Sequence, residues 1–73
     1  MIANNDTAKY VSDLMRDVSA RLNQSVFLVQ ETGSAEEFAS YRHAVGRVMG
    51  QILLEVLNPL YKTHPGLKPE GME

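Results

Sequence analysis

The chain has 73 residues, no cysteine and a formal net charge of −2. Its length limits it to one small domain, and the absence of cysteine excludes disulfides and thiolate metal ligands. Small domains without these supports usually gain stability from another subunit. The hydrophobic fraction of 44% indicates a folded chain, and the mildly acidic balance disfavours nucleic acid as a partner.

The first predicted element is a helix over residues 7–31. Its apolar residues recur every three or four positions, which is the spacing of one helix face: Ala8, Val11, Leu14, Met15, Val18, Leu22, Val26 and Val29. Asp6 or Asn5 is the expected N-cap, because a short polar side chain accepts a hydrogen bond from the first turn. Phe27 and Leu28 fall outside this face and are expected either in a subunit interface or beneath the following turn.

A tight turn over residues 32–34 separates this helix from a second one, predicted over residues 35–57. Gly33 suits a helix end because glycine adopts positive φ without a steric clash. The segment Ser34-Ala35-Glu36-Glu37 matches a capping box, which starts a new helix. The expected core positions of the second helix are Phe38, Tyr41, Val45, Val48, Met49, Ile52, Leu53 and Val56. So short a turn predicts an all-α antiparallel helical hairpin.

Asn58-Pro59 is expected to end the second helix, because proline disfavours helical geometry in the residue before it. A short turn is predicted over residues 59–62 and a flexible tail, rich in proline and glycine, over residues 63–73. The N-terminus lacks the basic and apolar segments of a signal peptide, and the longest apolar run is too short to span a bilayer. These features predict a cytoplasmic protein with no membrane partner.

A second stripe lies beside the core stripe of the second helix: Ala39, Gly46, Gly50, Leu54 and Leu57. Each glycine inside an exposed helix costs about 1 kcal/mol relative to alanine. Close approach of another helix would offset that cost, so we predict a homodimer in which two hairpins form a four-helix bundle. The alternative is that the glycines admit a bulky side chain of the first helix within one chain.

A short basic patch, Arg42, His43 and Arg47, also lies on the second helix. Doubled by a two-fold axis, it would contact phosphates. The predicted architecture resembles, in shape alone, the RNA-binding bundle ROP, which is also a dimer of hairpins. The simpler interpretation of the patch is a solvated helix flank.

The sequence carries no motif for catalysis, a metal or a cofactor. His43 has no metal-ligating residue three or four positions away, and Glu36 and Glu37 are accounted for by the helix cap. We therefore expect a small non-enzymatic interaction or regulatory protein that acts as a homodimer. The alternatives are a nucleic-acid-binding bundle and a subunit of a larger enzyme or secretion complex.

Overall fold

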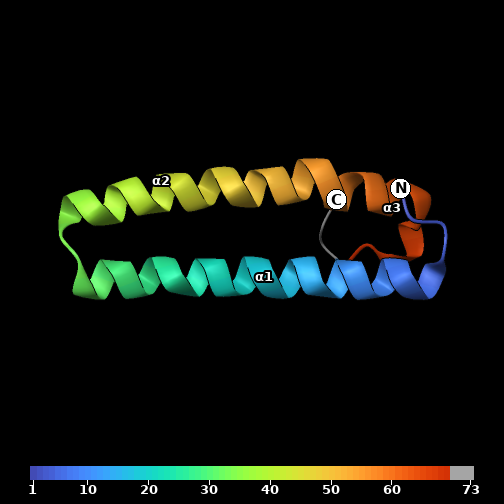
Figure 1. Ribbon diagram of the computed structural model, residues 1–73, viewed down its shortest axis with the longest axis horizontal. Helices are drawn as coiled ribbons and strands as arrows, with labels where there is room; N and C mark the ends of the chain where they lie inside the picture. The colour runs from blue at the N-terminus through green and yellow to red at the C-terminus, as the bar shows by residue number, and fades with distance from the viewer. Residues whose placement is uncertain (70–73) are drawn as a thin grey trace.

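The computed structural model describes residues 1–69 and is an all-α helical hairpin, which confirms the predicted fold class. Helices α1 (Asn5–Thr32) and α2 (Ala35–Gln51) lie antiparallel, joined by the turn at residues 33–34 (Figure 1). A π-helical segment, η1 (Ile52–Leu57), and a short helix, α3 (Asn58–Thr63), continue directly from α2. The molecule is elongated, with extents of 44 × 20 × 16 Å.

Side-chain caps determine where both long helices begin. The N-cap of α1 is Asn4 and not the predicted Asp6 or Asn5, because the Asn4 side chain accepts a hydrogen bond from the Thr7 N–H at 2.9 Å. The predicted capping box of α2 is confirmed. Ser34 Oγ accepts from the Glu37 N–H at 3.1 Å, and Glu37 Oε1 accepts from the Ser34 N–H at 2.8 Å.

Gly33 ends α1 in an extended conformation, with φ −107° and ψ 177°, and not in the left-handed conformation that the sequence suggested. Its N–H donates to the Val29 carbonyl oxygen at 2.8 Å. A Cβ atom at this position would lie 3.0 Å from that same oxygen, which is tighter than ordinary van der Waals contact. Glycine is therefore favoured here by lack of space rather than by the sign of φ.

Helical structure does not stop at Asn58-Pro59, where the sequence predicts an end. In η1 the helix widens, and the Asn58 N–H donates to the Leu53 carbonyl oxygen five residues earlier. A proline ring normally clashes with the carbonyl four residues before it. The wider turn spreads the carbonyls that precede Pro59, and the chain continues helically to Thr63.

The π segment also changes which residues face α1. One extra residue in a turn rotates everything after it by about 100° relative to an uninterrupted α-helix. Leu57, predicted on the outer stripe, is consequently 5% exposed, and Leu60 and Tyr61 are buried as well. Three other residues predicted in the core are exposed without any such rotation, because they do not follow the widened turn: Leu14 of α1, Val48 of α2 and Leu53 near the start of η1.

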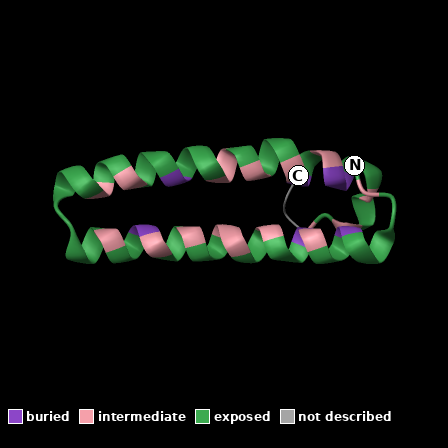
Figure 2. Ribbon diagram, viewed as in Figure 1, coloured by how far each residue is buried: buried purple, intermediate pink, exposed green. Residues whose placement is uncertain are grey.

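Burial is concentrated at the end of the hairpin that carries the chain termini. Ala8 and Ser12 of α1 are buried there together with Leu57, Leu60 and Tyr61. Elsewhere along the described helices the buried side chains are those of Val26 and Val45, on the facing sides of α1 and α2 (Figure 2). The half of the hairpin next to the turn therefore has a thin core.

Two serine–tyrosine pairs cross-link the helices through side-chain hydroxyls. Ser12 and Tyr61 hydroxyls are 2.6 Å apart in a buried site, and Ser25 and Tyr41 hydroxyls are 2.7 Å apart in a half-buried one. The Ser25 hydroxyl donates to the Leu22 carbonyl oxygen, so that Tyr41 donates to Ser25. Such directional bonds resist sliding of the two helices past each other.

The residues after α3 pack against the N-terminus where the sequence predicts a tail. Pro65–Leu67 forms a 3-10 turn, η2, and His64 Nε2 donates to the Ile2 carbonyl oxygen at 2.6 Å. The Met1 ammonium group donates to Thr63 Oγ1 at 3.3 Å. The rest of the predicted tail, residues 70–73, lies outside the described residues.

The buried hydroxyl pair generates the first prediction. Tyr61→Phe leaves the Ser12 hydroxyl buried without its partner and should lower the free energy of unfolding by about 1–3 kcal/mol. The double variant Ser12→Ala/Tyr61→Phe should recover much of that loss, since neither polar group remains. Tyr10→Phe is the matched control, because Tyr10 is 69% exposed. Urea unfolding followed by circular dichroism measures all three; equal stability of Tyr61→Phe and Tyr10→Phe would contradict the argument.

The capping box generates a prediction about pH. The hydrogen bonds from Ser34 lower the pKa of the exposed Glu37 carboxyl from its ordinary value of 4.5. A lowered folded-state pKa means that this stabilisation is present at neutral pH and is lost as pH falls below 4.5 through the folded value. Glu37→Gln retains a cap but has no charge to titrate. The stability difference between wild type and Glu37→Gln, measured by unfolding at neutral and acidic pH, should therefore shrink on acidification; a constant difference would refute the assignment.

Candidate interaction site

One face of the hairpin carries a shallow groove between the two long helices. Near the turn it is flanked by Phe27 of α1 and by Phe38, Arg42 and Gly46 of α2, among other residues. It continues toward the termini as an apolar groove of about 450 Å³. Met49 lines both parts, so they belong to one face. We call this surface the glycine face.

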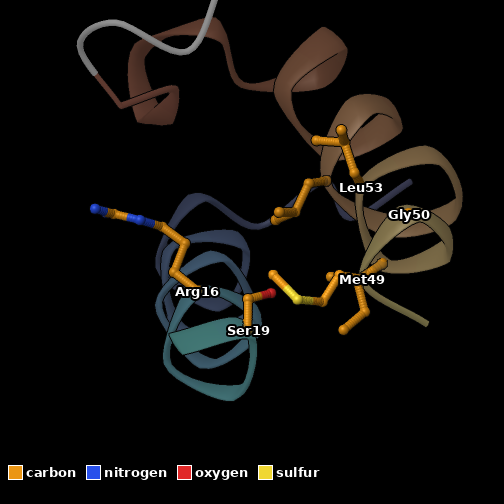
Figure 3. Close-up of a pocket in the computed structure, with 7 residues that line it drawn as sticks. Arg16, Ser19, Met49, Gly50 and Leu53 are labelled. Carbon is orange, nitrogen blue, oxygen red and sulfur yellow. The ribbon is translucent and has the colours of Figure 1, made fainter. Parts of the chain in front are cut away.

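The part of the groove beside η1 is the most apolar section. Its lining residues are Arg16, Ser19, Met49, Gly50, Ile52, Leu53 and Leu57. Figure 3 shows the Met49 side chain reaching from α2 toward Ser19 of α1, whereas Arg16 extends outward from α1. The groove therefore has an apolar interior, with a hydroxyl and a cation contributed by the α1 side.

Gly46 and Gly50 have no close neighbour within the chain. A Cβ atom built at either position meets nothing within 4 Å. No side chain of α1 lies close against the two glycine positions, so the alternative in which the glycines admit a bulky residue of the same chain is not supported. Their helix-propensity cost is uncompensated within the hairpin.

The predicted interface residues do not all lie on the surface. Ala39, Gly46 and Leu54 are exposed, and Gly50 is half-buried at the edge of the groove. Leu57 is buried, because the π segment turns it toward α1, so it cannot contribute an exposed contact as predicted. Four of the five residues therefore remain available to a partner.

The structure adds two residues to this face that the stripe on the second helix missed. Phe27 is 55% exposed and Leu53 is 39% exposed, and each lines a part of the groove. The angular position of Phe27 already placed it off the core of the first helix. Its presence on the same face as Gly46 depends on how the helices pair. Leu53 gave no signal, because regular helix periodicity assigned it to the core.

The predicted basic patch is brought together on α2. Arg42, His43 and Arg47 are exposed and surround an open hollow of about 460 Å³ next to Gly46. The Arg42 guanidinium carbon lies 5.7 Å from the centre of the Phe38 ring, which is within cation–π distance. These side chains have room to contact an anionic partner, and the patch adjoins the glycine face at Gly46.

Within residues 1–69, no group of three or more histidine or acidic side chains is placed to hold a metal ion. The lowered pKa of Glu37 has its cause in the helix cap and marks no catalytic centre. None of the helices described here combines the length and the apolar character needed to cross a membrane.

Comparisons of the chain with protein-family models, curated protein sequences and solved structures give no match.

Proposed function

We propose that this protein is a small non-enzymatic interaction or regulatory protein of the cytoplasm whose working form is a homodimeric four-helix bundle. The glycine face of each hairpin packs against that of its partner. The observation that carries this proposal is the open surface at Gly46 and Gly50, on a face that also exposes Phe27 and Leu53.

The surface area of the hairpin supports a partner of its own size. The chain exposes 5398 Å². A compact monomer of 8.1 kDa is expected to expose about 4500 Å², so the excess is about 900 Å². A standard protein–protein interface buries about 800 Å² per partner. The excess is therefore close to the area that each partner buries in one standard interface.

The elongated shape of the molecule also supports a dimer. Its radius of gyration is 14.5 Å, whereas a compact domain of 73 residues is expected near 11 Å. The thin core next to the turn leaves the long helices with few buried apolar contacts. A second hairpin packed on the glycine face would bury more apolar side chains in that half and would form a four-helix bundle.

A leucine at Gly46 tests the proposed interface. In the isolated hairpin Gly46→Leu should not clash and should raise helix stability by up to about 1 kcal/mol. In the dimer the same side chain holds the two α2 helices apart, so association should weaken by about tenfold or more. Sedimentation at micromolar concentration measures association, and urea unfolding of the dilute protein measures stability.

Ala44→Leu is the matched control, because Ala44 is exposed beside Arg47, Val48 and Gln51, outside the groove. It adds a similar side chain to the same helix and should leave association unchanged. A wild-type chain that sediments as a monomer, or equal effects of the two substitutions, would contradict the proposed interface.

Binding of nucleic acid is the second candidate, and the clustering of Arg42, His43 and Arg47 around one open hollow favours it. This candidate predicts salt-dependent binding of labelled RNA that is lost in Arg42→Ala/Arg47→Ala. The control Lys9→Ala/Arg21→Ala removes the same charge from residues that are paired with Asp13 and Asp17, and should retain binding. Absence of binding by the wild type, or equal loss in both variants, excludes the candidate.

A further inference from the structure

The half of the hairpin next to the turn exposes a large aromatic ring that its own core does not use. Val26 is buried between the helices, whereas the adjacent Phe27 is 55% exposed at the rim of the groove. Exposed aromatic rings of this kind are frequent anchors of protein interfaces, because they bury a large area at a small cost in side-chain entropy.

The other half of the same face contains a groove that can receive a ring. Its volume is about 450 Å³, and its apolar lining comes from Met49, Ile52 and Leu53, with a small contribution from the buried Leu57. A cavity of about 150 Å³ is enough to hold a benzene ring. Gly50 keeps one side of the groove free of a side chain, and a Cβ there would meet nothing within 4 Å.

The positions of ring and groove along the hairpin allow a two-fold axis to bring the ring of one copy to the groove of another. At 1.5 Å per residue, Phe27 lies about 9 Å from the turn and Leu53 about 28 Å from it. Gly46 and Gly50 lie between them, at about 18 and 24 Å. A two-fold axis that crosses the helices near Gly46 would bring Phe27 of each copy to the level of Leu53 in the other.

We infer that the groove beside η1 receives Phe27 of a second copy of this chain, so that two reciprocal ring-in-groove contacts close the dimer. The inference rests on the proposed function and names the anchor of that interface. The second copy is the occupant because ring and groove share one face, their spacing matches a two-fold arrangement, and the excess surface matches one standard interface.

Truncation of the ring is the first test. Phe27→Ala should raise the dissociation constant of the dimer about tenfold or more, as expected for an interface anchor. Leu28→Ala is the matched control, because Leu28 is the adjacent residue and is 59% exposed, but does not line the groove. It should change the constant by no more than about twofold, as expected for a residue outside the anchor. Circular dichroism and thermal unfolding establish that both variants fold.

Mixing two variants is the second test. Leu53→Gln makes the groove polar while leaving Phe27 intact, and should also weaken self-association. A mixed dimer of Phe27→Ala with Leu53→Gln retains one intact ring and one intact groove that face each other. It should therefore form more readily than either variant forms with itself, as measured by native mass spectrometry.

The outcomes separate this inference from the proposed function. If Phe27→Ala and Leu28→Ala weaken the dimer equally, or if the mixed dimer forms no more readily than either variant forms with itself, Phe27 is not the anchor. The proposed dimer is unaffected by these two results. If the wild-type chain is a monomer, both are wrong. A dimer of Phe27→Ala as tight as wild type would likewise show that this ring is not the anchor.

Discussion

Two helices can bury only one side of each other, and this limit determines most properties of the hairpin. Helix α1 has 28 residues and α2 has 17, yet the described part of the chain has six buried apolar residues. All the other apolar residues of the described chain are half-buried or exposed. The exposed surface, the elongated shape and the open glycines are all consequences of a single layer of contact between two long helices.

The π segment shows how a local departure from helix geometry redistributes this limited burial. Regular periodicity would keep Leu53 inside and Leu57 outside. The extra residue in the turn buries Leu57 and brings Leu60 and Tyr61 of α3 into the core, whereas Leu53, near the start of the segment, lines the groove. The firm core at the termini therefore depends on this segment, and the open apolar groove lies beside it. Pro59 lies two residues after the end of this segment, at a position where its ring would clash with a carbonyl group of a regular α-helix.

The hydroxyl pairs stabilise contacts within the hairpin, whereas the two glycines of α2 do not. The hydroxyl pair of Ser12 and Tyr61 satisfies both side chains inside the core and holds α3 on α1. The half-buried hydroxyl pair of Ser25 and Tyr41 joins α1 to α2 in the half next to the turn, where the core is thin. Gly46 and Gly50, in contrast, serve no contact within the chain. In the proposed bundle they are the places where two α2 helices approach, and the basic patch at Arg42 and Arg47 then borders the interface.

The sequence alone determined the fold class, the turn and the capping box, because helical periodicity and cap chemistry are local properties of neighbouring residues. It also identified Gly46 and Gly50 as unusual, since their cost is intrinsic to the helix. It could not determine that Leu57 is buried or that Phe27 and Leu53 share a face with the glycines. Those facts depend on the phase shift in η1 and on how α1 and α2 pair. Both are set by contacts between residues far apart in the chain, which only the tertiary structure decides.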